Sequence, residues 1–214
     1  MLSPMTASEK SRELCLLAPV IPVLVVDDPA DAYPMAQALV AGGLPVLEVT
    51  LRTEAALDVI SEMAKVKGGI VGAGTLLNAD DVAAALEVGA QFGVSPGATP
   101  RLLDACETQE LPLLPGAATA TEAMALYERG YATQKFFPAE ASGGAPALKA
   151  IGAPLPQISF CPTGGISLAS APQYLNLSNT LCVGGSWVAP KDLVKAKDWA
   201  GIEALAREAS GLSR

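Results

Sequence analysis

The segment Val46-Leu-Glu-Val-Thr-Leu-Arg52 is followed by an amphipathic run over residues 53–65 and a second apolar run over residues 69–74. The two apolar runs are typical of buried strands, and the run between them has the pattern of a helix. Two strands joined by a helix form a β-α-β unit, in which the strands pair in parallel. This stretch therefore predicts an α/β fold.

The same alternation of short apolar and longer amphipathic segments continues along the whole chain. Eight strand–helix units at intervals of roughly 20–26 residues predict a single (β/α)8 TIM barrel over residues 1–214, preceded by a short N-terminal helix. We expect strands at residues 20–26, 46–51, 69–74, 91–95, 111–115, 132–137, 158–162 and 181–184. We expect helices at residues 30–41, 53–65, 80–89, 100–108, 120–129, 145–151, 169–176 and 199–210.

A doubly wound open sheet is the structural alternative to the barrel. In such a sheet the turn after the first strand should be rich in glycine, because it binds phosphate there. Here the first strand ends in Val25-Val26-Asp27-Asp28, without glycine. The glycine-rich turns follow the seventh and eighth strands instead, which favours the barrel.

Composition narrows the classes of function. The 214 residues are 50% hydrophobic and 17% charged, which suits one large core. The formal net charge of −8 argues against nucleic acid or an anionic membrane as a partner. The chain has no histidine, so a zinc site built on histidine is excluded and proton transfer must use other side chains. The cysteines Cys15, Cys106, Cys161 and Cys182 are widely spaced without a CxxC pair, which argues against a thiolate metal or redox site.

The apolar run over residues 15–26 superficially resembles part of a targeting segment, but Pro19 and Pro22 interrupt it. We therefore expect a short helix that leads into a buried strand. No run approaches the roughly 18 apolar residues that cross a bilayer. Scattered cysteines without a disulfide framework favour a reducing cytoplasm.

One lysine lies in an unusual place. Lys135 sits in the segment 132–137, which reads as a buried strand, next to Phe136, Phe137 and Pro138. Burial disfavours the charged form of an amine, and a neutral lysine can attack a carbonyl carbon to form a Schiff base. The alternative is a lysine at a strand end whose amine reaches water.

The strand that opens this section carries two charges on one face. Alternation along the strand places Glu48, Thr50 and Arg52 together, opposite Leu47 and Val49. Charged side chains that are buried inside a barrel cost free energy, so their presence there indicates a function or a paired partner. We therefore expect Glu48 to transfer protons and Arg52 to bind a substrate carboxylate. The alternative is a structural ion pair at the barrel mouth.

Two glycine-rich turns, Pro162-Thr-Gly-Gly-Ile166 and Val183-Gly-Gly-Ser-Trp187, follow the seventh and eighth predicted strands. Barrels commonly bind phosphate at this place, through backbone N–H groups and hydroxyl donors such as Thr163 and Ser186. Plain tight turns are the alternative for each pair of glycines. The small residues of Gly72-Ala-Gly-Thr75 and Ser95-Pro-Gly97 leave room for a ligand, so we expect Pro96 to border it.

Taken in order, the motifs of this chain resemble those of a known family. They are Val46-Leu-Glu-Val-Thr-Leu-Arg-Thr53, Val71-Gly-Ala-Gly-Thr75, Ser95-Pro-Gly97, Lys135-Phe-Phe-Pro-Ala-Glu140, Phe160-Cys-Pro-Thr-Gly-Gly-Ile166 and Gly184-Gly-Ser-Trp187. With them the chain closely resembles 2-dehydro-3-deoxy-6-phosphogluconate (KDPG) aldolases, which are Schiff-base aldolases of the Entner–Doudoroff pathway. The resemblance extends from about Pro19 to Trp187.

The resemblance implies an enzyme that cleaves a 2-keto-3-deoxy sugar acid phosphate and releases pyruvate, with no metal or organic cofactor. Cleavage of 4-hydroxy-2-oxoglutarate (KHG) is a further expectation, and similar proteins look like homotrimers. By resemblance Lys135 forms the Schiff base and Glu48 is the general acid and base. The residues implied for substrate binding are Arg52 and Thr75 at the pyruvate carboxylate, Phe137 beside the lysine, and Thr163, Gly164, Gly165, Gly185 and Ser186 at the phosphate.

The chain departs from this family at one place. Many relatives have a basic residue just after the first strand, where this chain has Asp27 and Asp28. A phosphate contact from that side is therefore in doubt.

Two other functions use the same residues. A metal-independent isomerase or synthase of the phosphate-binding barrel type would need the glycine turns but no lysine adduct. A non-catalytic sugar-phosphate binding protein would hold the ligand without turnover. Only the aldolase would form a covalent adduct with pyruvate on a lysine.

Overall fold

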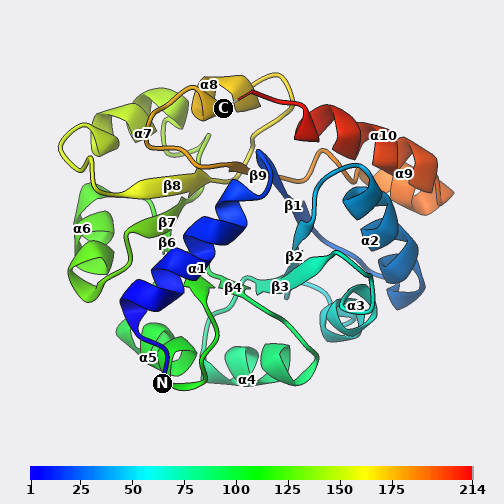
Figure 1. Cartoon of the computed structure of the whole chain (residues 1–214), viewed down its shortest axis with the longest axis horizontal. Coiled ribbons are helices and arrows are strands. Elements are labelled where there is room, and N and C mark those ends of the chain that lie inside the picture. Colours follow the sequence, from blue (N-terminus) through cyan, green and yellow to red (C-terminus); the bar gives the residue numbers. More distant parts are fainter. Residues whose placement is uncertain (214) are drawn as a thin grey trace.

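The computed structural model describes residues 1–213 as strands that surround a centre, with helices on the outside (Figure 1). All strand pairs are parallel, as the β-α-β pattern predicts. The strands are β1 (Val20–Leu24), β2 (Val46–Thr50), β3 (Ile70–Gly74), β4 (Gly93–Val94), β5 (Leu113–Leu114), β6 (Gly116–Ala117), β7 (Thr133–Phe136), β8 (Ser159–Pro162) and β9 (Val183–Gly185). The α/β class and all eight predicted strand positions are thus confirmed.

The hydrogen-bonded ladder is divided, which corrects the expectation of one continuous eight-stranded sheet. Six strands follow the order β5-β4-β3-β2-β1-β9, and a second sheet has the order β6-β7-β8. The fifth predicted strand is interrupted at Pro115, which has no N–H to donate to a ladder. Between β8 and β9 only the single bridges Phe160↔Thr180 and Thr163↔Gly184 connect the two sheets.

The helices occupy the predicted places, with shorter bounds in several cases. They are α1 (Pro4–Leu16), α2 (Ala32–Ala41), α3 (Ala56–Met63), α4 (Ala79–Glu87), α5 (Pro100–Thr108), α6 (Ala120–Arg129), α7 (Gly144–Gly152), α8 (Ala171–Leu175), α9 (Lys191–Ala196) and α10 (Trp199–Ser210). A 3-10 turn, η1 (Pro29–Asp31), precedes α2. The six-residue α9 was not predicted, because none of its residues is buried and it has no apolar periodicity.

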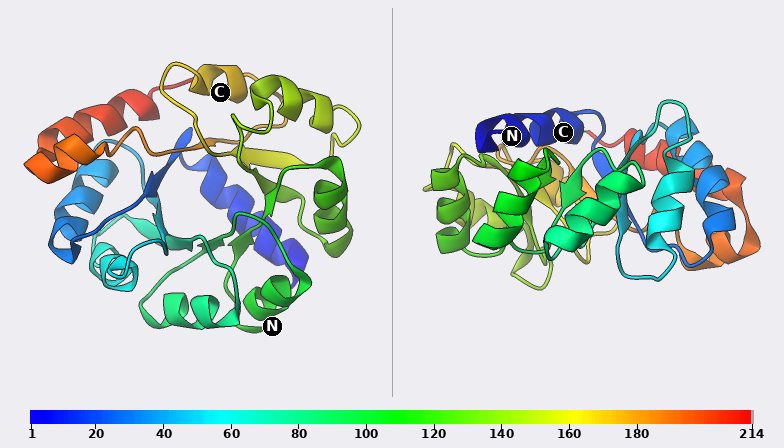
Figure 2. Two further views of the ribbon diagram at one scale, coloured as in Figure 1. Left: turned by 180° about the vertical axis from the view of Figure 1, so that it is seen from behind. Right: turned by 90° about the horizontal axis from the view of Figure 1, so that it is seen from below.

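Helix α1 lies across one flat side of the molecule (Figure 2). The Ser8 hydroxyl accepts a hydrogen bond from the backbone N–H of Thr133, and the Ser11 hydroxyl donates to the carbonyl of Leu113. Thr133 and Leu113 are the first residues of β7 and β5. The helix therefore covers the amino ends of the strands and leaves the carboxyl ends open on the opposite side.

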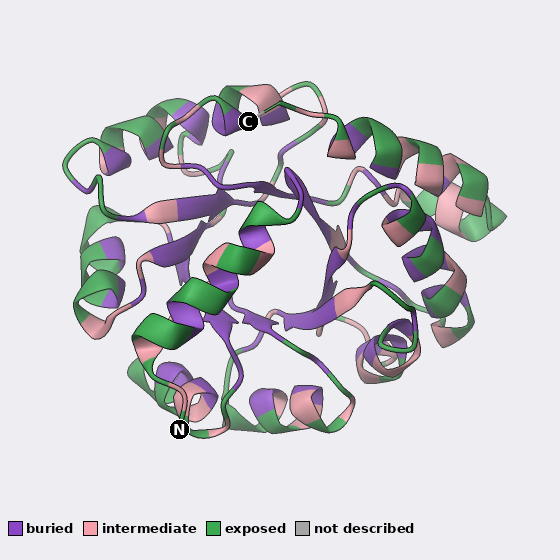
Figure 3. Cartoon of the chain, in the orientation of Figure 1, coloured by how far each residue is buried: buried purple, intermediate pink, exposed green. Residues whose placement is uncertain are grey.

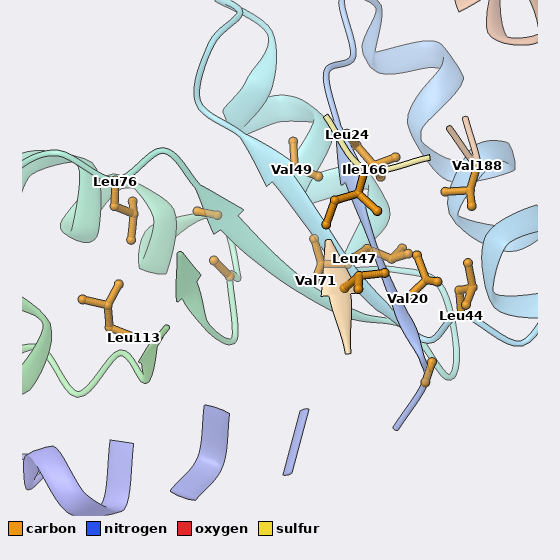
Figure 4. Close-up of a cluster of buried hydrophobic side chains, with 14 of the residues drawn as sticks. Val20, Leu24, Leu44, Leu47, Val49, Val71, Leu76, Leu113, Ile166 and Val188 are labelled. Atoms are coloured by element: carbon orange, nitrogen blue, oxygen red, sulfur yellow. The ribbon is translucent and has the colours of Figure 1, made fainter. Parts of the chain in front are cut away.

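Apolar side chains fill two layers. The strands and the inner faces of the helices are buried (Figure 3). Leu47, Val49 and Val71 belong to the outer layer, between strands and helices (Figure 4). Phe92, Val94 and Leu114 belong to a separate inner cluster with Cys15, Cys161 and Cys182. The ring of strands is therefore a packed core, and the cysteines that look scattered in the sequence meet in space.

No helix among the described residues is long and apolar enough to cross a membrane.

Candidate active site

A cavity of about 480 Å³ opens among the carboxyl ends of the strands, on the side opposite to α1. Every predicted site residue except Gly185 lines it. The lining residues are Val23, Glu48, Thr50, Arg52, Thr75, Pro96, Lys135, Phe137, Thr163, Gly164, Gly165, Ile166, Gly184 and Ser186. Residues from distant parts of the sequence are thus gathered at one place, as a parallel α/β architecture requires.

Two buried charges face each other at the base of this cavity. The Nζ atom of Lys135 lies 3.3 Å from Oε1 of Glu48, and the two side chains are 6% and 4% exposed. The same Nζ lies 5.0 Å from the centre of the Phe137 ring, within the range of a cation–π contact. Lys135 therefore does not reach water from a strand end, and its ion-pair partner Glu48 comes from a strand in the other sheet.

The environment of Glu48 suits proton transfer. Burial raises the pKa of its carboxyl group, and the nearby charge of Lys135 partly offsets this effect. Gly74, on the adjacent strand β3, leaves the space that the carboxylate occupies. A Cβ atom at that position would lie 2.3 Å from Oε1 of Glu48, closer than packed atoms approach.

The remaining polar residues of β2 continue along the same wall. The Nε atom of Arg52 donates to the Thr50 hydroxyl at 3.1 Å, and that hydroxyl donates to the carbonyl of Leu24 at 3.0 Å. The predicted alternation of Glu48, Thr50 and Arg52 on one face is confirmed. Arg52 has further N–H groups on its guanidinium, which can bind a carboxylate in a forked geometry.

Thr75 has an unusual backbone conformation for a residue other than glycine. Its φ is 65°, in the left-handed region. Such strain is often found where a ligand requires a particular geometry, and Thr75 lines the cavity.

The two glycine turns form the outer part of the cavity. Gly164 and Gly165 have φ values of 109° and 80°, which L side chains rarely adopt. At Gly184 a Cβ atom would lie 2.2 Å from the Thr163 hydroxyl, so the two turns touch each other here. Ser186 is exposed at the cavity edge. The arrangement offers backbone and hydroxyl groups to an anionic ligand.

A hydrogen-bonded pair below this loop fixes its position. The Tyr174 hydroxyl donates to Oε1 of Glu140 at 2.7 Å, and the Glu140 backbone N–H donates to the carbonyl of Gly164 at 3.0 Å. Glu140 therefore connects the turn at Gly164 to Tyr174 of α8.

Four cavity residues were not among the predicted site residues: Val23, Thr50, Ile166 and Gly184. The sequence contained an indication for three of them. Thr50 shares the strand face of Glu48, and Ile166 and Gly184 lie in the glycine turns. Gly185 faces the Trp187 ring, which a Cβ atom would meet at 1.8 Å. It is therefore a packing position for Trp187 and not part of the cavity wall.

The acidic residues after the first strand lie outside the cavity lining. Both Asp27 and Asp28 are exposed, and Asp28 accepts a hydrogen bond from the backbone N–H of Ala30 at 2.9 Å. Asp28 therefore caps the turn η1. Among residues 1–213, no cluster of three metal-ligating side chains lies in the cavity.

Comparison with known proteins gives a consistent result. The family model "KDPG and KHG aldolase" matches residues 12–205. The chain is 54% identical over 200 residues to the KHG/KDPG aldolase of Escherichia coli (strain K12), which covers 93% of this chain and 94% of that protein.

Two solved structures are similar in both sequence and fold. The KDPG aldolase of Zymomonas mobilis ZM4 with 3-phosphoglycerate has a TM-score of 0.92 at 51% identity, covering 97% of this chain and 98% of that one. The KDPG aldolase of Legionella pneumophila, with pyruvate captured at low pH as a covalent carbinolamine, has a TM-score of 0.90 at 43% identity. That match covers 94% of this chain and 98% of the other.

Proposed function

The chain belongs to the KDPG and KHG aldolase family, and on this premise we propose that it cleaves KDPG to pyruvate and glyceraldehyde 3-phosphate. The protein would then act in the Entner–Doudoroff pathway as a carbon–carbon lyase. Cleavage of KHG is a second activity, supported by the name of the Escherichia coli relative. The pair of Lys135 and Glu48 in a largely apolar cavity base is the observation that carries this proposal.

Lys135 supplies the nucleophile. After its proton has passed to Glu48, the amine of Lys135 attacks the C2 ketone of the substrate, and the proton returns to the carbinolamine hydroxyl as water leaves and an iminium ion forms. The carbinolamine captured on the Legionella pneumophila relative is the kind of intermediate that precedes such an iminium. The cation withdraws electrons from the neighbouring carbon atoms, so that the C3–C4 bond can break.

Glu48 supplies the proton transfers. Its carboxylate, directly or through one water, removes the proton of the C4 hydroxyl as the C3–C4 bond breaks, and the aldehyde leaves. The electron pair of the broken bond remains in an enamine on Lys135. Glu48 then returns a proton to C3, and hydrolysis releases pyruvate and the free lysine.

Arg52 and Thr75 bind the carboxylate of the pyruvate part. The guanidinium of Arg52 is oriented by Thr50 and lies on the same strand face as Glu48. Phe137 excludes water beside the amine. Pro96 lines the cavity without adding a charge.

The phosphate binds to the two glycine turns. Thr163 and Ser186 offer hydroxyl groups, and Gly164 and Gly165 allow ligand oxygens to approach the backbone closely. The relative from Zymomonas mobilis holds 3-phosphoglycerate, a small phosphorylated acid. Asp27 and Asp28 lie outside the cavity lining, so neither contributes to this phosphate site.

We further propose that the two sheets act as one eight-unit TIM barrel, because two bridges connect them and one of these, Thr163↔Gly184, joins two residues that line the cavity. The expected homotrimer remains part of the proposal, and light scattering at micromolar concentration tests it. A cytoplasmic location is supported by four cysteines that are thiols and not disulfides.

The deciding experiment is borohydride reduction in the presence of pyruvate, followed by mass spectrometry of the peptides. The aldolase proposal requires one adduct, on Lys135. Turnover of KDPG must accompany it. Turnover of another sugar phosphate without an adduct would favour the isomerase or synthase, and binding without adduct or turnover would favour the non-catalytic binding protein.

A further inference from the structure

Three cysteines from distant parts of the chain meet in the inner core. Cys15 comes from α1, Cys161 from β8, and Cys182 immediately precedes β9. Their Sγ atoms all lie within 4.8 Å of one another, and the residues are only 1%, 2% and 0% exposed. The fold therefore assembles a three-sulfur cluster that no sequence spacing indicates.

The surroundings of this cluster are almost entirely apolar. Its neighbours in the inner core include Phe92 and Leu114.

We propose that Cys15, Cys161 and Cys182 form a binding site for a thiophilic divalent metal ion, with Zn²⁺ as the natural occupant. Zn–S bonds are about 2.3 Å long, so three coordinating sulfur atoms lie about 3.8–4.0 Å apart. The observed separations require an inward movement of at most about 1 Å for each pair. Side-chain rotation of three cysteines can supply that movement.

Ligand type and charge select this class of ion. Thiolates favour soft metals and disfavour Mg²⁺ and Ca²⁺, which prefer oxygen. Three thiolates together with a divalent ion carry one net negative charge, whereas three thiolates with Cu⁺ carry two. A buried net charge costs free energy, so the divalent ion is favoured.

The site would fasten α1 to the barrel. Ser8 and Ser11 of this helix each form a side-chain hydrogen bond to the backbone of a strand. A metal ion held by Cys15, Cys161 and Cys182 would add a further connection, made of stronger bonds. The ion would stabilise the fold. Cys161 lies opposite Lys135 on the neighbouring strand, but the proposed metal site does not depend on the chemistry at Lys135 and Glu48.

The test is titration of the reduced whole protein with Cd²⁺, whose thiolate complexes absorb in the ultraviolet. The matched control is Cys106→Ala, because Cys106 is also fully buried but lies in α5, outside the cluster. We expect one Cd²⁺ per chain in the wild type and in Cys106→Ala. In Cys15→Ala the affinity should fall by at least about 100-fold, since a direct ligand matters more than its outer partners. Zn²⁺ should raise the melting temperature in the same two proteins and not in Cys15→Ala.

Retained tight binding by Cys15→Ala, or no absorption band in the wild type, would overturn the proposal. Circular dichroism and borohydride trapping of pyruvate check that Cys15→Ala is folded. If that variant does not fold, X-ray absorption of the wild-type Cd²⁺ complex decides alone. Three sulfur neighbours support the site, and two or fewer contradict it.

Discussion

The Nζ atom of Lys135 lies 3.3 Å from Oε1 of Glu48, although 87 positions separate the two residues in the sequence. Each is the ion-pair partner of the other in a buried place. Removing one partner of a buried pair leaves the other charge uncompensated. Substitution of either residue therefore changes the environment of the other, so each variant needs a measurement that is specific to its own role.

Replacement of the lysine should remove the chemistry and leave the fold. We expect Lys135→Met to lose KDPG cleavage and borohydride trapping, because Lys135 is the only amine among the described residues that line the cavity. Lys149→Met is the matched control, since Lys149 is exposed on α7. Steady-state kinetics and mass spectrometry measure both effects. Substantial cleavage by Lys135→Met would rule out the assignment of the nucleophile.

Replacement of the glutamate should separate Schiff-base formation from proton transfer. Glu48→Gln should still be trapped on pyruvate, while exchange of the pyruvate methyl protons slows by about 10²–10⁴-fold. NMR in deuterated water measures the exchange, and Glu54→Gln, at an exposed position, serves as control. An exchange rate equal to that of the wild type would show that Glu48 has only a structural role.

The acid side of the pH profile should reflect the raised pKa of Glu48. The group acts as a base when ionised, so activity falls when the pH decreases through its pKa. Because burial raises that pKa above the ordinary value of 4.5, activity should begin to fall at a higher pH than an exposed carboxylate would give. The pH dependence of kcat for proton exchange measures it. A midpoint at or below 4.5 would contradict the effect of burial.

A small change next to the carboxylate should displace it. In Gly74→Ala the new methyl group would lie 2.3 Å from Oε1 of Glu48. We expect a loss of stability of about 1–3 kcal/mol, as for other overpacked sites, and a lower kcat. Gly97→Ala is the control, because a Cβ atom there meets nothing within 4 Å. Denaturant unfolding should distinguish the two variants, and equal stability would show that Glu48 moves freely.

The phosphate assignment depends on a comparison of two substrates. Ser186→Ala removes one hydroxyl donor to a charged acceptor, a contact that contributes about 1.5–3 kcal/mol. The loss in kcat/KM should appear with KDPG and nearly vanish with KHG, which has no phosphate. Equal losses on both substrates would mean that Ser186 only shapes the cavity.

Gly165→Val should have the same selective effect but is a less direct test. Gly165 has a φ of 80°, and a Cβ atom would lie 2.9 Å from the Glu140 side chain. The substitution therefore disturbs the loop as well as the approach of the ligand. Ser186→Ala, at an exposed position, changes the contact without that strain.

Local patterns in the sequence determined the strands, most helices and the face on which each side chain lies. The alternation through Glu48, Thr50 and Arg52 is one example, since neighbouring residues of a strand point to opposite sides whatever surrounds them. The apolar strand around Lys135 and the glycine turns after the seventh and eighth strands indicated candidate site residues, and the resemblance of the motifs implied their roles. These features are local, so they could be inferred without knowing how the strands are arranged.

Only the tertiary structure decided which distant residues touch. It divided the ladder at Pro115, turned Gly185 toward Trp187, and placed Cys15 beside Cys161 and Cys182. Such contacts depend on the position of each strand around the centre and on where α1 crosses it. Hydrophobic burial, which drives this packing, is not directional, so the sequence specifies that these groups are buried but not which neighbour each one meets.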